Sequence, residues 1–324
     1  MEVFSIAILL FSFLLLLSIG TPVAWSIIIS SLFTLLVSVP FLPALTTISQ
    51  RMATGIDSFA LLAIPFFILS GELMNKGGVA HRLVAFAKAL VGFLPGGLAL
   101  INVISAMLMG SVAGSAMASA SAMGSILGPE MEKEGYSKGF GVAINITSAT
   151  TGLVIPPSNI LIVYSLASGG ASIAALFLAG YIPGILTGLF LMAVAMIWAK
   201  KKNFKTGKRA PLKTVFSSFV RAFPSLMLLF VVIGGIVSGV FTATEASAIA
   251  VIYTLVLGFF YKEITLKNLP SILLKSSITT AIVMFLIGAS MSMSWVLSFE
   301  NIPEMISSGI LSPVSYTHLR AHET

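Results

Sequence analysis

The feature that most constrains this chain is the length of its stretches without any charged residue. Five stretches contain no Asp, Glu, Lys or Arg, and they cover residues 3–50, 89–129, 139–199, 222–244 and 276–299. About 20 apolar helical residues cross a bilayer core, so these stretches hold roughly eight to ten crossings or half-crossings. Charged residues make up only 9% of the chain, against about 25% in soluble domains. We therefore expect an all-α polytopic membrane protein.

Two other interpretations of the apolar sequence fit less well. A membrane β-barrel alternates apolar and polar residues along each strand, and residues 9–17 and 27–37 show no such alternation. A signal peptide begins with basic residues, whereas residues 1–5 hold no Lys or Arg and the apolar run continues past Pro22. We expect this segment to be a membrane helix. Because the chain has no cysteine, disulfides and cysteine metal sites are excluded.

Basic residues gather in one linker, which divides the chain into two halves. Eight of the 18 Lys and Arg residues lie between positions 200 and 221. Cytoplasmic loops of membrane proteins carry such an excess, so we interpret residues 200–221 as a cytoplasmic loop. A patch for nucleic acid or anionic lipid is the alternative. The absence of interleaved aromatic residues favours topology over nucleic-acid binding.

The two halves share a faint internal repeat. Residues 18–24 and 238–246 each place a glycine, Gly20 or Gly239, just before an apolar helical stretch. Pro43 and Pro270 recur at a similar spacing. Duplicated halves are common among secondary transporters.

The most informative region lies between residues 96 and 168. Residues 97–109 favour a helix, residues 110–115 (Gly-Ser-Val-Ala-Gly-Ser) are expected to interrupt it, and residues 116–127 resume it. The small residues are open to two interpretations. They allow close packing of ordinary spanning helices, or they break the helix into a re-entrant hairpin whose tip exposes backbone and hydroxyl oxygens. Taken alone, they favour packing.

A second interruption shifts that balance towards a re-entrant hairpin. Residues 139–151 favour a helix, residues 150–159 cannot continue it, and residues 160–166 resume it. Pro156 and Pro157 remove two backbone donors and clash with the preceding turn. Carbonyl groups freed within hydrocarbon cost several kcal/mol each unless protein, water or an ion satisfies them. Coordination of an ion is the most economical use of these carbonyls.

Sodium fits the ligands that these two segments offer. Discontinuous membrane helices bind Na⁺ through carbonyls at half-helix C-terminal ends and attract anionic groups to the N-terminal ends. The hydroxyls of Ser111 and Ser115 would complete such a site. A proton relay needs carboxylates or histidines, and calcium or magnesium needs carboxylates. Neither segment contains these residues.

Four motifs together resemble the large membrane subunit of TRAP transporters. They are residues 65–75 (PFFILSGELMN), 110–123, 151–159 (TGLVIPPSN) and 239–246 (GVFTATEA), and the resemblance runs over about residues 1–313. It implies an elevator-type ion-transporter fold with inverted repeats, a re-entrant hairpin and broken helices. It also implies a large permease of a sodium-coupled importer of small organic anions such as C4-dicarboxylates, in a bacterial or archaeal inner membrane.

The resemblance also implies partners and site residues. The expected partners are a small TRAP membrane subunit, a periplasmic substrate-binding protein, the organic anion and the lipid bilayer, without nucleic acid. Sodium is expected as the coupling ion and no organic cofactor is expected. The expected sodium ligands are Ser111, Gly114, Ser115, Gly152, Ile155 and Pro157. The expected substrate contacts are Ser115, Ser158 and Asn159.

The resemblance gives expected boundaries as well. Scaffold helices are expected in residues 1–95 and 222–313, the first half of a transport domain in 96–168, a membrane helix in 169–199 and the cytoplasmic loop in 200–221. The family's second hairpin would fall beyond residue 324, so the chain is expected to be C-terminally truncated. Residues 314–324 turn abruptly polar and are expected to be a non-native tail.

Two carboxylates in apolar surroundings need separate interpretation. Glu245 is either functional, as intramembrane carboxylates usually are, or part of a capping box with Thr242 at a helix start. The capping box is favoured. Glu72 and Asn75 end a charge-free run, residues 58–71, that contains Pro65 and is too short for a straight crossing. This run is expected to turn within the protein, and a role in binding substrate is the less favoured alternative.

Two other function classes compete with a transporter. An intramembrane hydrolase needs a base beside its serine, yet His81 is the only histidine before the polar tail and no His-Glu-x-x-His motif occurs. A passive membrane scaffold would not need two helix breaks at membrane depth. We therefore favour the transporter.

Overall fold

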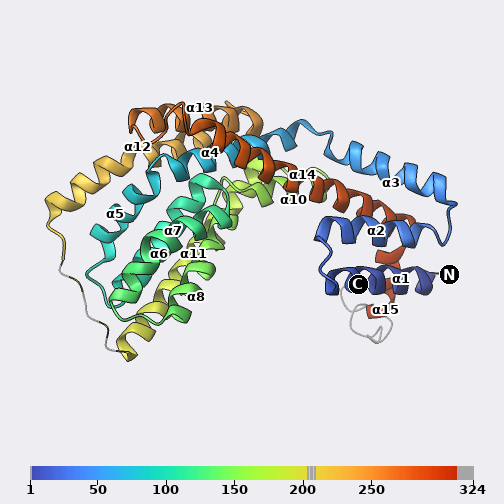
Figure 1. Ribbon diagram of the computed structural model, residues 1–324, viewed down its shortest axis with the longest axis horizontal. Helices are drawn as coiled ribbons and strands as arrows, with labels where there is room; N and C mark the ends of the chain where they lie inside the picture. The colour runs from blue at the N-terminus through green and yellow to red at the C-terminus, as the bar shows by residue number, and fades with distance from the viewer. Residues whose placement is uncertain (1, 203, 205–206, 208, 312–324) are drawn as a thin grey trace, which may run out of the picture. The chain divides into compact units, whose positions relative to one another are not determined.

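The computed structural model describes residues 2–311 except 203, 205–206 and 208, and every regular element in this part is helical (Figure 1). The predicted tail at 314–324 lies outside the described residues. The helices are α1 Glu2–Ser18, α2 Val23–Leu35, α3 Phe41–Ile56, η1 Phe59–Leu62, α4 Ala63–Lys76, α5 Val79–Val91, α6 Gly97–Ala113, α7 Ala116–Lys133, α8 Lys138–Ala149, α9 Thr151–Val154, α10 Asn159–Ala167, α11 Ile173–Lys201, α12 Leu212–Val237, α13 Ala243–Phe260, α14 Leu269–Phe299 and α15 Ile302–Leu311.

The length and apolar character of these helices confirm a polytopic membrane protein. Five are long and apolar enough to cross a bilayer: Phe59–Lys76, Ile173–Lys201, Leu212–Val237, Ala243–Phe260 and Leu269–Phe299. A sixth span is broken, because Lys138–Val154 and Asn159–Ala167 meet at an angle of 52°. Three shorter apolar helices lie in α1, α2 and α6. Counted as half-crossings, they bring the total within the predicted range.

The helices form two compact units. The smaller contains the chain up to Ser58 together with the chain from Ala281 on, and the larger contains residues 59–280. In the smaller unit Leu35, Ala44, Ile48 and Val296 form a buried core. The Glu300 carboxylate accepts a hydrogen bond of 2.7 Å from Ser5 Oγ and one of 2.5 Å from Ser38 Oγ. Each predicted scaffold block, 1–95 and 222–313, therefore contributes to both units.

Corresponding turns support duplicated halves. Gly20 precedes α2 with φ +82° and Gly239 precedes α13 with φ +73°, a region that favours glycine. Pro43 and Pro270 lie in the first turns of α3 and α14. The first half breaks its long segment into α3, η1 and α4, whereas α14 is continuous.

Each half also lends a segment to the other. In the larger unit α4, from the first half, packs along α13 of the second. In the smaller unit the later part of α14 meets α2, where the rings of Phe285 and Trp25 lie 5.3 Å apart. This exchange explains why the units do not follow the sequence halves.

The basic linker is shorter than predicted. Helix α11 runs to Lys201 and α12 begins at Leu212, so only the middle of the predicted loop 200–221 connects two helices. The loop was predicted from its charge. Lys and Arg are also good helix formers, so basic residues at both ends of the predicted loop belong to α11 and α12 instead. Pro211 stands at the N-cap of α12 with φ −58°, so the helix starts directly after it.

Candidate ion and substrate site

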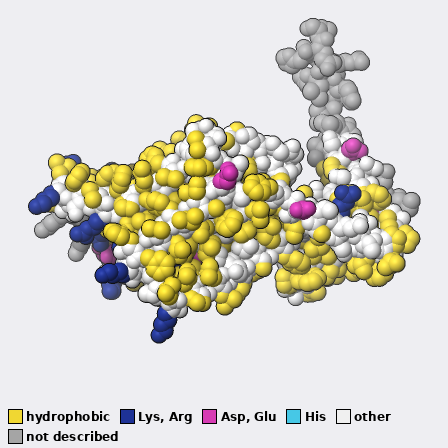
Figure 2. Space-filling view, turned by 90° about the horizontal axis from the view of Figure 1, so that it is seen from above, with side chains coloured by type: hydrophobic (Ala, Val, Ile, Leu, Met, Phe, Trp, Pro, Cys, Tyr) yellow, Lys and Arg dark blue, Asp and Glu magenta, His cyan; other side chains and the backbone are white. Residues whose placement is uncertain are grey.

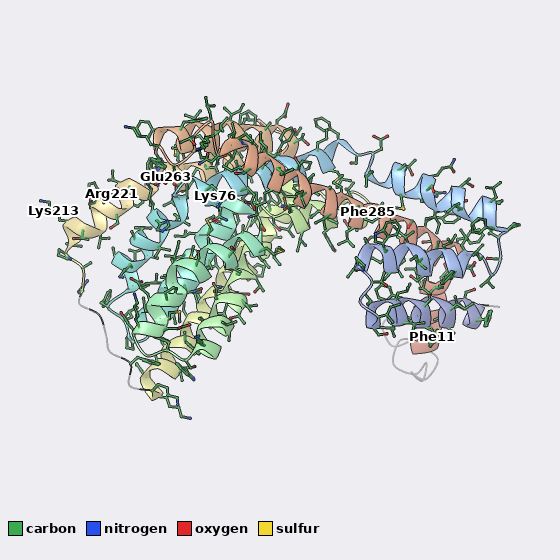
Figure 3. The ribbon with its side chains drawn as sticks, viewed as in Figure 1. Phe11, Lys76, Lys213, Arg221, Glu263 and Phe285 are labelled. Atoms are coloured by element: carbon green, nitrogen blue, oxygen red, sulfur yellow. The ribbon has the colours of Figure 1, made fainter. Side chains whose placement is uncertain are left out.

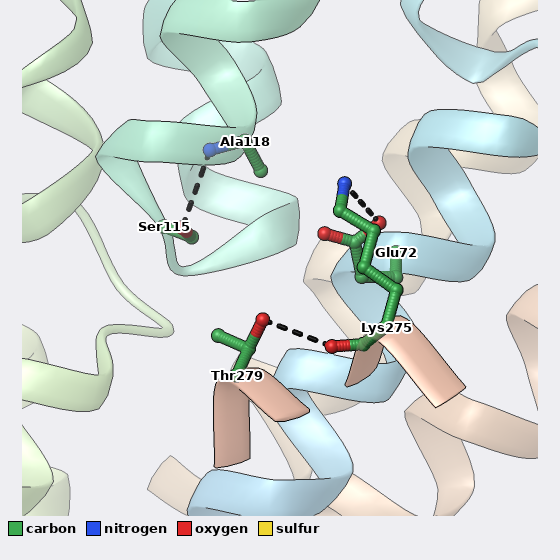
Figure 4. Close-up of polar contacts among 5 residues, drawn as sticks. All are labelled: Glu72, Ser115, Ala118, Lys275 and Thr279. Carbon is green, nitrogen blue, oxygen red and sulfur yellow. Dashed lines mark hydrogen bonds and ion pairs between the residues drawn. The ribbon is translucent and has the colours of Figure 1, made fainter. Parts of the chain in front are cut away.

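A helical hairpin with a two-residue tip forms one side of the site. Helix α6 continues through Gly110 to Ala113, and only Gly114 and Ser115 separate it from α7. The predicted interruption at 110–115 is therefore too long. Gly114 turns the chain with φ +60°, and Ser115 caps α7 by accepting a hydrogen bond of 3.3 Å from the backbone N–H of Ala118. Figure 4 shows this cap at the hairpin tip.

A broken helix forms the other side. The helical conformation continues through α9 to Val154, so the break covers residues 155–158 rather than the predicted 150–159. The peptide bond between Pro156 and Pro157 is cis. The Ser158 hydroxyl donates a hydrogen bond back to the carbonyl of Leu153. The side chain of Ser158 thus satisfies one carbonyl that the break would leave without a donor.

The structure brings the two segments into backbone contact. A Cβ atom on Gly110 would lie 2.2 Å from the Cα of Gly152, and one on Gly152 would lie 2.7 Å from the Cα of Gly110. At the tip, a Cβ on Gly114 would lie 2.8 Å from the carbonyl oxygen of Pro157. Real Cβ atoms do not approach other atoms this closely. The proposed ion site required these two segments to meet. Gly110 serves close packing, and Gly114 lies at the turn between α6 and α7.

Side-chain amides fix the hairpin against the broken helix. Asn102 of α6 donates to Asn145 Oδ1 of α8 over 3.4 Å and accepts from Ser148 Oγ over 2.8 Å. Asn145 donates to the carbonyl of Ala120 in α7 over 2.8 Å. Asn102 and Ser148 are buried, where an amide without partners costs about 1–3 kcal/mol. This network was missed at the sequence level, because isolated Asn and Ser residues give no pattern.

Glycines of α11 hold the broken helix from behind, and the sequence did contain their signal. A Cβ on Gly180 would lie 2.4 Å from the carbonyl oxygen of Val154, and one on Gly184 would lie 2.4 Å from Ile155 Cγ1. Their spacing of four residues is the small-xxx-small pattern of close membrane helices. Reading that pattern in residues 180–188 would have predicted a close neighbour for the break.

The predicted sodium ligands gather around this contact. Ser111 is buried, and its hydroxyl hydrogen goes to the carbonyl of Leu108 over 2.9 Å, so its oxygen lone pairs stay available. Gly152 and Ile155 are buried as well, and Pro157 lines the same small cavity as Ser111. With Gly114, Ser115 and Pro157, the set consists entirely of uncharged oxygens. These are ligands that a hard monovalent cation accepts.

The predicted substrate residues lie at two helix N-termini. Ser115 caps α7, and Ser158 and Asn159 begin α10. Asn159 Oδ1 is buried and has no hydrogen-bond partner within the part of the chain that the structure describes. Because a buried polar atom without a partner is costly, Asn159 has capacity for a ligand.

The two carboxylates have different surroundings. Glu72 Oε2 on α4 pairs with Lys275 Nζ on α14 over 2.9 Å, and the Glu72 side chain is 11% exposed (Figure 4). Glu72 lies within α4, and residues 59–71 of the run that was predicted to turn belong to Phe59–Lys76, a helical segment long and apolar enough to cross a bilayer. Glu245 and Thr242 form the favoured capping box, with Glu245 Oε2 2.8 Å from the Thr242 nitrogen. The cap interpretation is confirmed.

The sequence matches a known protein family and several of its members. Residues 10–319 match a family described as "Tripartite ATP-independent periplasmic transporter, DctM component". The chain is 53% identical over 310 residues to the protein YgiK of Salmonella typhimurium, covering 96% of this chain and 71% of the relative. It is 39% identical to the C4-dicarboxylate TRAP transporter large permease protein DctM of Pseudomonas aeruginosa, covering 78% and 60%.

A third relative carries a different substrate in its name. The sialic acid TRAP transporter large permease protein SiaM of Vibrio cholerae is 36% identical over 304 residues, covering 94% of this chain and 70% of the relative. Across the three, the chain spans between 60% and 71% of the relative's length.

Proposed function

This chain belongs to the DctM family of tripartite ATP-independent periplasmic transporters, and from that premise we propose that it acts as the large permease of a sodium-coupled importer of small organic anions. The family consists of transporter permeases, so the chain is a transport protein and not an enzyme. It is a multi-pass protein of the inner membrane. The hydrolase and the passive scaffold are both set aside by this membership.

The contact between the hairpin tip and the broken helix supports sodium coupling most directly. Gly110 meets Gly152 and Gly114 meets Pro157 across this contact, and Ser111 and Pro157 line one small cavity. We propose that Ser111, Gly114 and Ser115 of the hairpin and Gly152, Ile155 and Pro157 of the break supply the ligands. Bound Na⁺ would neutralise the partial negative charge of the carbonyls that α9 leaves at its end. Within the described residues no group of three or more His, Cys, Asp or Glu side chains gathers, so the proposed ligands are neutral oxygens throughout.

The N-termini of α7 and α10 support an anionic substrate. Both end in unsatisfied backbone N–H groups, which attract carboxylates. Ser115, Ser158 and Asn159 stand at these ends. We propose that they contact one carboxylate of the solute. The named relatives transport C4-dicarboxylates or sialic acid, and both solutes carry such a group.

The proposal includes the partners of the family. A tripartite system needs a small membrane subunit and a periplasmic binding protein in addition to the permease, and we propose both for this chain. We also propose an elevator movement, in which the transport domain moves relative to the scaffold.

Uptake driven by an ion gradient tests this function. The complete transport system, with this chain as the permease, is reconstituted in vesicles, and uptake of labelled succinate and N-acetylneuraminate is measured under Na⁺ and K⁺ gradients. We expect uptake of one solute with Na⁺ only. Equal uptake with K⁺, or uptake driven by a proton gradient alone, would contradict sodium coupling.

Two buried serines of α6 provide a test variant and a control variant for the proposed ion site. Ser111→Ala removes an oxygen from the proposed site, and we expect the Na⁺ concentration for half-maximal uptake to rise roughly tenfold, as for a lost contact to a charged group. Ser105→Ala removes a buried hydroxyl of the same helix that has no partner among the described residues. It should leave the sodium dependence unchanged, and an equal effect of both variants would contradict the assignment of Ser111.

A further inference from the structure

A wide groove with basic walls lies in the larger unit, away from the proposed sodium site. It has a volume of about 1480 Å³ and opens between α5, the beginning of α12 and the residues around the end of α13. Typical small-molecule sites measure about 300–1,000 Å³, so the groove is larger. Five cationic side chains and one carboxylate line it: Lys76, Arg82, Lys88, Lys213, Arg221 and Glu263. Figure 3 shows four of them, on or next to α4, α12 and α13.

Most of these cations have no counter-ion. Lys88 Nζ lies 2.9 Å from Glu130 Oε1. Among the described residues, no carboxylate oxygen lies within 4.0 Å of the charged nitrogens of Lys76, Arg82, Lys213 or Arg221. Glu263 is the one acid on the wall. Its Oε1 and the Nη1 of Arg82 both lie close to the position that a Cβ on Gly78 would take, 3.1 and 2.8 Å from it, without reaching ion-pair distance of each other. Gathering like charges is unfavourable by itself, so the groove gains free energy from any anion that enters it.

Arg82 is held in place at the floor of the groove. Its Nη1 donates a hydrogen bond of 2.7 Å to the carbonyl of Gly78, and its Cζ lies 3.6 Å from the centre of the Tyr261 ring. A fixed guanidinium loses little conformational entropy when it binds an anion and offers its remaining N–H groups to phosphate oxygens. The hydroxyls of Thr214, Ser217 and Ser218 lie on the same walls.

The neighbouring sequence does not supply the missing anion. Residues 200–211 contain six Lys or Arg and no Asp or Glu. The space-filling view shows Lys and Arg side chains gathered at one end of the larger unit, at the left of Figure 2. The counter-ion must therefore come from outside this part of the chain.

The groove lies at the level where a bilayer presents its headgroups. Helix α12 enters the membrane from the basic linker and α13 returns, so the first turns of α12 and the end of α13 lie at the same membrane face. That is the cytoplasmic face, because the linker carries the basic excess. The rim is apolar and open: Val220 is 51% exposed and Phe260 is 78% exposed. Cations below an apolar rim match a molecule with an anionic head and hydrocarbon tails.

From these observations we propose that the groove binds an anionic phospholipid of the cytoplasmic leaflet. The phosphate would lie among Arg82, Lys213 and Arg221, and an acyl chain would follow Val220 and Phe260. A soluble anion would gain nothing from the exposed apolar rim. Each Lys or Arg near an anionic headgroup attracts it independently of transport, so the inference does not depend on sodium coupling.

Native mass spectrometry of the full chain in neutral detergent tests this binding. Phosphatidylglycerol is titrated against phosphatidylcholine, and the retained lipid is counted. We expect one phosphatidylglycerol to be retained in preference to phosphatidylcholine. The variant Arg82→Gln/Lys213→Gln/Arg221→Gln should weaken this retention on the order of a hundredfold, since three cations are lost. The control Lys133→Gln/Lys138→Gln/Lys267→Gln removes three exposed charges outside the groove and should change retention little.

Further arms of the experiment separate the sources of the anion and guard against misfolding. Arg82→Lys/Arg221→Lys keeps the charges and should retain the lipid, which shows that loss in the first variant reflects charge. Glycerophosphoglycerol, the headgroup without acyl chains, should compete poorly. Equal competition by it, equal retention by the groove variant, or equal loss in the control would each overturn the proposal. An acidic protein segment as the true occupant would appear as unchanged lipid retention in the groove variant.

Discussion

Gly110 and Gly152 meet with no side chain between them, and this contact decides which substitutions the hairpin tolerates. Protein interiors are close-packed, so atoms added at a backbone contact have nowhere to go. The nearest atoms at both positions are backbone atoms of the facing glycine. Backbone can yield only if a whole helix shifts. The ligands of the proposed sodium site are positioned by this contact.

Replacing Gly152 with alanine should therefore loosen the site. We expect Gly152→Ala to lower the free energy of unfolding by about 1–3 kcal/mol through overpacking, measured by thermal unfolding in detergent. Gly234→Ala is the matched control, because nothing lies within 4 Å of its Cβ position in α12. This control should be neutral or stabilising by up to about 1 kcal/mol, as expected for an exposed helix interior. Equal destabilisation by both variants would contradict the contact.

Only some residues of this site could be predicted from the sequence. Gly114 and Pro157 were each predicted at a helix break, the family resemblance implied one site for both, and the structure places them together. Asn102 and Asn145 gave no such signal, since their partnership depends on which faces of α6 and α8 meet. Single-sequence patterns report local geometry, and long-range pairing requires the tertiary structure.

At the scale of helices, the ends of the breaks were harder to predict than their existence. Gly110, Gly152 and Val154 were expected outside helices, yet α6 includes Gly110 and α9 includes Gly152 and Val154. Tertiary packing explains the difference, because a helical Gly110 gives Gly152 room to approach. Intrinsic propensity alone disfavours glycine within a helix, and tertiary contacts routinely override it.

Two adjacent hydroxyls of α8 test whether the amide network fixes the broken helix. The Ser148 hydroxyl lies 2.8 Å from Asn102 Oδ1 of α6 and 2.5 Å from the carbonyl oxygen of Ile144 in its own helix. The Thr147 hydroxyl donates to carbonyls of its own helix, those of Ala143 and Ile144. We expect Ser148→Ala to destabilise the protein by about 1–2 kcal/mol, since it leaves Asn102 Oδ1 without that donor. Thr147→Ala should change stability by less than about 0.5 kcal/mol. Thermal unfolding of both variants in one detergent compares them, and a larger loss for Thr147→Ala would refute the network.

At the scale of the whole molecule, the sequence predicted the membrane class and the repeat but not the exchange of segments. Charge-free length is a local property, so it predicted the spans that lie in charge-free stretches but not Phe59–Lys76, which contains Glu72. Which unit a helix joins depends on distant partners, and α4 packs with α13 of the other half. No pattern within residues 63–76 predicts that α4 packs against α13.

The cysteine-free chain allows a clean test of topology. Lys202 follows α11 and Val240 precedes α13, so they lie beyond opposite ends of α12. With a membrane-impermeant maleimide, we expect Val240→Cys to be labelled in intact cells and Lys202→Cys only in inverted vesicles. Labelling of both variants from the same side would contradict a single crossing by α12. The unsubstituted chain provides the blank, because it has no thiol.

The glycine contact also limits how an ion could leave. Side chains can rotate aside and open a path one rotamer at a time, but facing peptide planes have no such freedom. Where α6 and α9 touch, rotation of a single side-chain bond therefore cannot separate the hairpin from the broken helix. For the proposed sodium site, this contact predicts that an ion is released only when the hairpin and the broken helix move together.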